Sequence, residues 1–385
     1  MTFIRDAVVI DAVRTPIGVG KPSRGQFSGL HPVDLGGQVV SSLLSRNQIE
    51  ARAVEDVIWG CVSQVGEQSF NIGRSTALAA GLPESTPGVT VDRQCGSSLQ
   101  ALAFAAAGVL AGHADVVIAG GVEVMSRVPM FSNINDADPY GRVRTRYEDR
   151  LVPQGISAEL LAERYQLSRR YLDELSATSH ERAAAAQRSG EFDDEIVPVL
   201  TDTGEVTTDQ GIRPDTNVGT LGNLRPVFRE DGVVTAGNAS QISDGAAALL
   251  VTTSAKAAEL GVRPIARIHS VTTVGVDPIL MLHGPIVATA KILDRAGLSL
   301  DDIGAFEINE AFASVLGAWY AATGASPART NQLGGAIALG HPLGASGARI
   351  AATLLHRMRR TGTKYGLEAI CEGGGMANAM VFERL

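Results

Sequence analysis

The chain has 385 residues, of which 45% are hydrophobic and 19% charged, and its formal net charge at pH 7 is −8. The negative balance argues against nucleic acid as the main partner, since phosphate binding needs a concentrated positive face. No stretch approaches the roughly 20 uninterrupted apolar residues of a membrane span, so no membrane partner is expected. A chain of this length can bury a large core, and apart from its 43 glycines the composition is ordinary for an α/β protein.

The cysteines are few and far apart. Cys61, Cys95 and Cys371 are odd in number and lack CxxC or Cys/His metal spacing. This pattern indicates neither a disulfide framework nor a metal site. It favours a reducing compartment, so we expect a cytoplasmic protein. Arg5 and Asp6 interrupt the first apolar run, which argues against a signal peptide.

Strands and helices alternate through the first 120 residues. Short β-branched runs bounded by turn residues predict strands, and longer Ala- and Leu-rich runs predict helices. This alternation predicts a sheet with parallel strands and helices on both faces. The expected strands cover 7–13, 54–59, 89–91 and 115–119, and the expected helices cover 35–44, 71–81 and 99–110.

The pattern changes at about Gly121. Residues 127–160 are rich in Asn, Asp, Arg, Tyr and Pro, and residues 201–240 are again loop-like. Two helices are expected between them, over 158–165 and 169–189. Because long ordered loops usually carry function, we interpret 121–240 as an inserted lid or binding subdomain.

Regular structure resumes after the insertion and repeats the order of the first half: strands, a glycine-rich turn, a helix and a final strand pair. No residue-level repeat is visible, so duplication is only weakly indicated. The expected strands cover 246–251, 265–274, 305–308, 367–371 and 378–382, and the expected helices cover 255–260, 289–296, 311–320 and 346–360.

Cys95 lies in the turn between an expected strand and an expected helix. The small residues after it, Gly96, Ser97 and Ser98, would let a substrate approach the sulfur. A helix N-terminus favours the thiolate, so this position predicts a nucleophile with a lowered pKa. A buried structural cysteine is the alternative.

Three other glycine-flanked polar turns follow strands. Asn309 opens the sequence NEAF, where it could hold a water or substrate oxygen or simply cap a helix. His341 lies between Gly340 and Pro342, and a neutral histidine is the usual base that activates a thiol. Cys371 precedes a Glu and three glycines, whose N–H groups could stabilise an oxyanion.

These four turns, CGS at Cys95, NEAF at Asn309, GHP at His341 and CEGGG at Cys371, resemble those of the thiolase family, in the same order and along nearly the whole chain. The resemblance implies a five-layered α-β-α-β-α body of two similar halves, each a five-stranded mixed sheet with flanking helices, and a homodimer or homotetramer. It implies an N-terminal half over 1–120 and 241–264, an inserted loop domain over 121–240, and a C-terminal half over 265–385.

The resemblance also implies the chemistry. A family member cleaves a 3-oxoacyl-CoA with CoA to acetyl-CoA and a shortened acyl-CoA. In this sequence Cys95 would be the acylated nucleophile, His341 its base and Cys371 the acid/base of C–C cleavage. One oxyanion hole would use His341 and a water held by Asn309, and the other the N–H groups of Cys95 and Gly373. A redox pair of Cys95 and Cys371 is the competing interpretation, but no CxxC supports it.

No permanently bound cofactor is implied, because coenzyme A enters as co-substrate. Arg213 matches a family position at the adenine nucleotide, and Ser240 one near the pantetheine; the alternative for Arg213 is a solvated loop charge. The residues implied to contact the acyl group or CoA are Gln154, Met281, His283 and Phe312.

Departures from the family pattern bear on the substrate. Gln154 replaces a common Met, His283 stands where a small residue is frequent, and Gln241 where glycine is common. They favour a bulky, branched, aromatic or steroid-derived acyl chain in a degradative enzyme of fatty-acid β-oxidation type. The alternatives are a biosynthetic acetyl-CoA acetyltransferase, a non-catalytic lipid-binding protein of this fold, and a ketoacyl synthase. Cys371 argues against the last of these.

Overall fold

The computed structural model describes residues 5–385. Five strands of the first half form one layer, in the order β1-β8-β5-β3-β4. The pairs β1–β8 and β8–β5 are antiparallel, whereas β5–β3 and β3–β4 are parallel. The sheet is therefore mixed and not the parallel sheet expected from the alternation alone. The bounds are β1 Val8–Arg14, β8 Ser243–Thr252, β5 Val116–Val124, β3 Asp56–Gly60 and β4 Gly88–Val91, and β2 (Gly18–Val19) pairs with β8.

The second half repeats this layer with one strand shortened. Its order is β9-β12-β11-β10, and only β10–β11 is parallel. Beside β10, where β4 would have its counterpart, Thr330 makes an isolated parallel bridge with Phe306. Two short pairings, of Val8 with Arg267 and Val9 with Ala266, connect the layers through β1 and β9. The bounds are β9 Ala266–Gly275, β12 Met376–Arg384, β11 Tyr365–Glu372 and β10 Ala305–Ile308.

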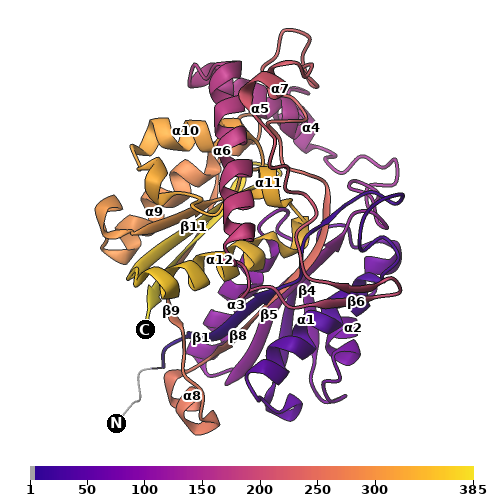
Figure 1. The fold of residues 1–385 in the computed structure, drawn as a ribbon, viewed down its shortest axis with the longest axis vertical. Coiled ribbons are helices and arrows are strands. Elements are labelled where there is room, and N and C mark those ends of the chain that lie inside the picture. Colours follow the sequence, from indigo (N-terminus) through magenta and orange to yellow (C-terminus); the bar gives the residue numbers. More distant parts are fainter. Residues whose placement is uncertain (1–4) are drawn as a thin grey trace.

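Helices form the other three layers of a five-layered body (Figure 1). Helices α3 and α12 pack on each other between the two sheets, in a core of residues from both halves, among them Leu99, Ile350 and Ile370. Helices α1 and α2 cover the outer face of the first sheet, and α9 and α10 that of the second. The bounds are α3 Ser97–Ala111, α12 Ser346–Thr361, α1 Pro32–Arg46, α2 Ile72–Ala79, α9 Gly284–Ala296 and α10 Ala313–Thr323.

The helices α4, α5 and α7 of the segment between β5 and β8 form the upper part of the molecule in Figure 1, whereas its β6 hairpin lies lower, beside α1. Strand β5 continues to Val124, so the chain leaves the sheet there and returns at Ser243. Helices α5 and α6 contact α10, and α6 also contacts α11, so the helical part of the segment packs on the second half and the hairpin on the first. Its elements are α4 Val143–Arg146, α5 Gln154–Arg164, α6 Arg169–Arg188, β6 Val199–Thr201, β7 Gly204–Val206 and α7 Val218–Gly222.

The remaining elements are α8 Ser254–Leu260, α11 Ala336–Leu339 and six short 3₁₀ turns. One of these turns, Met281–His283, immediately precedes α9. Within residues 5–385, one stretch, Gln94–Ala111, is long and apolar enough to cross a membrane, and helix α3 lies in it. Because 67% of that stretch is buried inside the protein, its apolar character belongs to a core helix between two sheets.

Candidate active site

Cys95 lies in the turn between β4 and α3, directly before the helix. Gln94 has a φ of +48°, a left-handed conformation that is uncommon outside glycine, and Gly96 is the N-cap of α3. Cys95 is 6% exposed, so its sulfur is enclosed by the protein. The turn therefore holds the sulfur at the start of a helix, as the sequence predicted.

The expected lowering of the Cys95 pKa is wrong for this structure. Burial raises the pKa of Cys95 to about 12, and the carboxyl group of Glu372 adds to the increase. Desolvation therefore outweighs the helix N-terminus. Cys95 is a neutral thiol at rest, and a base must take its proton before the sulfur can attack a carbonyl carbon.

His341 has the neutral ring that such a base requires. Burial, with a smaller contribution from Arg349, lowers the pKa of His341 to about 3, so the ring is neutral at pH 7. The Ser346 hydroxyl donates to Pro342 O at 2.8 Å and lies 2.6 Å from Nδ1 of His341. A Ser346 hydroxyl that donates to Pro342 O accepts from Nδ1–H, and in that tautomer the lone pair is on Nε2, which faces the Asn309 amide.

The backbone around His341 positions the ring. Its N–H points to the carbonyl of Gln241 and the hydroxyl of Ser243, both at 3.1 Å. Gly340 has a φ of +108°, and a Cβ there would collide with the Ser243 side chain, so only glycine fits. The glycine before the histidine is therefore a structural requirement of this turn.

Asn309 is brought to the same ring. Its Nδ2 lies 3.4 Å from Nε2 of His341, and the side chain is buried. The Oδ1 atom has no hydrogen-bond partner among the described residues. Asn309 also precedes Phe312, the N-cap of α10, so it is not the helix cap that the alternative interpretation required. The free oxygen fits a water or substrate group.

Cys371 and Gly373 lie at the hairpin between β11 and β12. Cys371 is fully buried, and burial, followed by the proximity of Cys95, holds its pKa well above the ordinary value. Gly374 and Gly375 have φ values of +83° and +78°, which makes the tight turn a glycine turn. Beside Gly373, a Cβ would lie 3.1 Å from Gln94 Oε1 and 3.2 Å from Gln154 Nε2. The turn that carries Cys95, the hairpin between β11 and β12, and the start of α5 therefore meet at Gly373.

Apolar side chains close the other side of Cys371. Met281 and Phe312 are buried in the same cluster as Cys371. Phe228 packs edge-on against Phe312, with ring centroids 6.1 Å apart. His283, another predicted acyl contact, has no hydrogen-bond partner for its Nδ1 among the described residues. Burial and the charge of Arg164 lower the pKa of His283.

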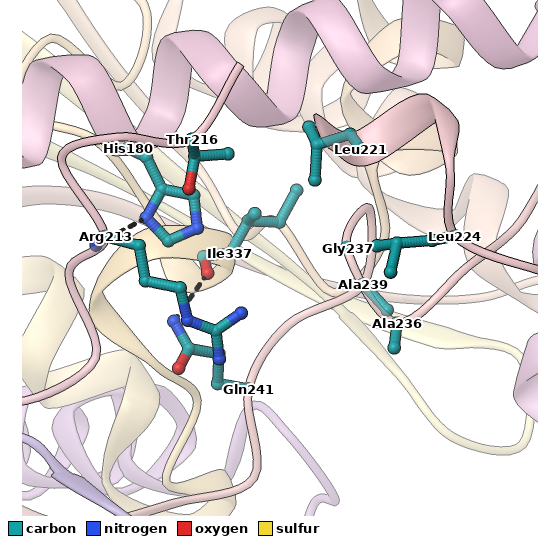
Figure 2. Close-up of a pocket in the computed structure, with 10 residues that line it drawn as sticks. All are labelled: His180, Arg213, Thr216, Leu221, Leu224, Ala236, Gly237, Ala239, Gln241 and Ile337. Carbon is teal, nitrogen blue, oxygen red and sulfur yellow. Dashed lines mark hydrogen bonds between the residues drawn. The ribbon is translucent and has the colours of Figure 1, made fainter. Parts of the chain in front are cut away.

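Arg213 lines a cavity of about 130 Å³ beneath α6 and α7 (Figure 2). Its backbone N–H donates to Nδ1 of His180 at 3.1 Å, and burial lowers the pKa of His180 to about 4. The Gln241 amide donates to the carbonyls of Gly211 and Ile337, each at 2.9 Å. The other lining residues are Thr216, Leu221, Leu224, Ala236, Gly237 and Ala239.

Ser240 lies between two of the lining residues but does not line the cavity. Its N–H donates to Ala311 O at 2.9 Å, and neighbouring Ala239 bridges Phe312. The segment beside the cavity is therefore hydrogen-bonded to the NEAF turn that carries Asn309. This connection joins the cavity to the cysteine and histidine turns.

Two family models together match almost the whole chain: the thiolase N-terminal domain over residues 7–255 and the thiolase C-terminal domain over residues 262–384. The chain belongs to the thiolase family. It is 47% identical to steroid 3-ketoacyl-CoA thiolase FadA6 of Mycobacterium tuberculosis, over 99% of this chain and 94% of that protein. It is 44% identical to 3-ketoacyl-CoA thiolase FadA of Escherichia coli K12, over 99% and 100%.

A solved structure gives the same result for the fold. The acetyl-CoA acetyltransferase of Bacillus anthracis matches this thiolase with a TM-score of 0.90 at 37% identity, over 99% of both chains. The five-layered fold expected from the motifs is thereby confirmed, and the chain is an acyltransferase. In residues 5–385, no group of three or more His, Cys, Asp or Glu side chains is arranged to hold a metal ion.

Some residues of this thiolase site were missed in the sequence. Ser346, which lies 2.6 Å from Nδ1 of His341, is only five residues after it, and the GHP spacing could have indicated it. His180 lies within an expected helix and not in a glycine-flanked turn, so the sequence did not mark it as a cavity residue. Glu372 follows Cys371 directly, but its direction toward Gly96 depends on the pairing of the two halves.

Proposed function

We propose that this thiolase works in the degradative direction, cleaving a 3-oxoacyl-CoA with free CoA through an acyl-Cys95 intermediate. Two observations carry this proposal: the neutral His341 ring has its Nε2 3.4 Å from Nδ2 of Asn309, and the buried Cys371 thiol lies close enough to Cys95 for the two to affect each other. Fatty-acid β-oxidation is the kind of reaction sequence that needs such a step.

The residues divide the reaction between them. His341 Nε2 takes the Cys95 proton, and the thiolate attacks the 3-oxo carbon. As the C2–C3 bond breaks, its electron pair leaves with acetyl-CoA, and the Cys371 thiol protonates that carbanion. The incoming CoA thiol then gives its proton to Cys371 and attacks acyl-Cys95, and this step returns the Cys95 thiolate.

Two oxyanions form along this path, and each needs preorganised donors. We assign one to His341 with a water held by Asn309, whose Oδ1 is free. The other is assigned to the N–H groups of Cys95 and Gly373. The placement of Gly373 beside Gln94, the residue before Cys95, supports this second assignment.

Arg213 is proposed to hold a phosphate of CoA at the cavity beneath α6. Arg213→Gln should raise KM for CoA by about tenfold, because a hydrogen bond to a charged group contributes about 1.5–3 kcal/mol. Steady-state thiolysis with CoA and with pantetheine, which lacks the nucleotide, measures this. Only KM for CoA should rise. Arg188→Gln, at the exposed end of α6, is the matched control, and an equal rise for pantetheine would contradict the assignment.

The acyl pocket is proposed to accept a long or bulky chain, including a steroid-derived one. Gln154 lies at Gly373, and the Phe228–Phe312 pair with Met281 forms an apolar wall at Cys371. The 47% identity to a steroid 3-ketoacyl-CoA thiolase supports this range of substrates. His283 is retained as an acyl contact on its unpartnered Nδ1.

A panel of 3-oxoacyl-CoAs tests function and substrate together. We expect kcat/KM for long-chain or bulky cyclic substrates to exceed that for acetoacetyl-CoA by about tenfold, the effect of burying two further methylene groups. Gln154→Met should change this ratio, and Gln187→Met, on the exposed surface of α6, should not. Preference for acetoacetyl-CoA would instead favour the acetyltransferase, and a folded protein inactive on all members would indicate a non-catalytic lipid-binding protein.

The biosynthetic acetyltransferase is kept as the second candidate because the similar Bacillus anthracis structure is that of an acetyl-CoA acetyltransferase. We further propose a homodimer or homotetramer in the cytoplasm. Strand β4 is the last strand of its sheet, and Val89 on it is 46% exposed, so the edge offers backbone groups and an apolar contact to a second copy.

The three-part division is also a proposal: 1–120 with 241–264, an insertion over 121–240 that binds CoA, and 265–385. The change of family model between residues 255 and 262 supports the last boundary. The continuation of β5 to Val124 moves the start of the insertion by a few residues. Residues 1–4 lie outside the described residues.

A further inference from the structure

Glu372 places a carboxyl group against the backbone of the nucleophile turn. It is the last residue of β11 and follows Cys371, so the two side chains point to opposite faces of the strand. A Cβ on Gly96 would overlap the Glu372 carboxyl oxygen, so the two groups are in direct contact. The Asn378 amide of β12 donates to Gly96 O at 3.3 Å from the same side. The second half of the chain thus packs directly behind Cys95.

The carboxyl group is buried without compensation. Glu372 has no exposed surface, and neither of its oxygens has a hydrogen-bond partner among the described residues. A buried carboxylate without partners is costly, whereas the protonated acid is tolerated. Arg93 and Asp92 face it from the turn, Cys95 and Cys371 are the neighbouring thiols, and β12 contributes the neutral Asn378. Burial, against the opposing effect of Arg93, raises the pKa of Glu372 to about 8.

A negative charge on Glu372 would oppose the charge that catalysis needs. The Glu372 carboxylate adds to the increase that burial causes in the pKa of Cys95, and it acts on Cys371 in the same direction. Two negative charges in one buried space disfavour each other. The Cys95 thiolate therefore forms more readily while Glu372 is protonated.

We propose that Glu372 is a neutral acid in the working enzyme and a positioning residue whose ionisation limits formation of the Cys95 thiolate at alkaline pH. The inference rests on the proposed role of Cys95 as nucleophile. Glu372 does not contact the reacting atoms, and it affects catalysis through the ionisation of Cys95.

Alkylation of Cys95 by iodoacetamide tests this without requiring turnover. The rate is followed by peptide mass spectrometry from pH 6.5 to 9.5 in the wild type and in Glu372→Gln, an isosteric neutral variant. At pH 6.5 the two rates should agree, since both side chains are neutral. At pH 9.5 the variant should react about tenfold faster, the effect of one pKa unit on the thiolate fraction. Its thiolysis profile should also lose a fall at alkaline pH relative to the wild type.

Glu307→Gln is the matched control, because Glu307 is another buried glutamate whose pKa is raised by burial to about 8. Its charged neighbours are two arginines and two glutamates, and Cys95 is not among them. Its Cys95 alkylation profile should follow the wild type. Parallel profiles for Glu372→Gln and the wild type would overturn the proposal. If Glu372→Gln speeds Cys95 alkylation tenfold but the wild-type protein does not catalyse thiolysis, the proposed function is rejected. The proposed effect of Glu372 on Cys95 then still stands.

Arg93→Gln keeps the test decisive if Glu372→Gln does not fold. Arg93 lowers the pKa of Glu372, so its removal should keep Glu372 protonated to higher pH. The pH above which Cys95 alkylation is held back should then move upward. An unchanged or lower transition pH in a folded Arg93→Gln protein would contradict the proposal.

Discussion

Cys95→Ala should abolish thiolysis, with a loss in kcat of about 10⁴–10⁶-fold, the range found when a catalytic nucleophile is removed. The hydroxyls of Ser97 and Ser98 at the start of α3 are buried and hydrogen-bonded to Gln94 O and Ala348 N–H, so we expect neither to replace the thiol. Steady-state thiolysis gives the rate, and intact mass spectrometry after incubation with an acyl-CoA shows whether an acyl adduct forms. The wild type should gain one acyl group and the variant none.

Cys61→Ala is the control for Cys95→Ala. Cys61 is also buried, and its sulfur is near the side chains of Glu123 and Gln68. Its truncation should reduce the free energy of unfolding by about 1 kcal/mol and leave thiolysis unchanged. An acyl adduct on the Cys95→Ala protein would show that another residue is the nucleophile.

Cys371→Ala should separate the two halves of the reaction. The buried Cys371 thiol has a pKa well above the ordinary value, so it is protonated at rest and able to protonate the acetyl-CoA carbanion. Without it, thiolysis should fall by about 10²–10⁴-fold, the usual contribution of a general acid. Acylation of Cys95 from acetyl-CoA should continue, since that step uses His341. Thiolysis kinetics and intact mass measure the two outcomes.

Ile370→Val is the control for Cys371→Ala. It removes one methyl group from the preceding buried position of β11, at a cost of about 0.5–1.5 kcal/mol in the free energy of unfolding, and should not affect thiolysis. Equal loss of acylation and thiolysis in Cys371→Ala would show that Cys371 supports the whole site and not one proton transfer.

Local sequence was enough to predict many of the helices and strands and the reactive groups. Helix α12 was expected over 346–360 and runs from Ser346 to Thr361, because the period of apolar residues and the small residues of the turn are local properties. The four motifs likewise indicated the thiolase family, and the two family models confirm it. Residue type and spacing along the chain suffice for such inferences.

Strand direction, the composition of the cavity and the charge state of the site depend on tertiary contacts. The parallel sheet expected from alternation is mixed, since β8 returns from a long insertion to pair between β1 and β5. The cavity joins His180, Arg213 and Gln241, which are distant in the sequence. Local sequence predicted a lowered pKa for Cys95, but burial between two halves and the nearby Glu372 raise it to about 12. Desolvation depends on every atom packed around a group, and no single segment of the chain specifies that environment.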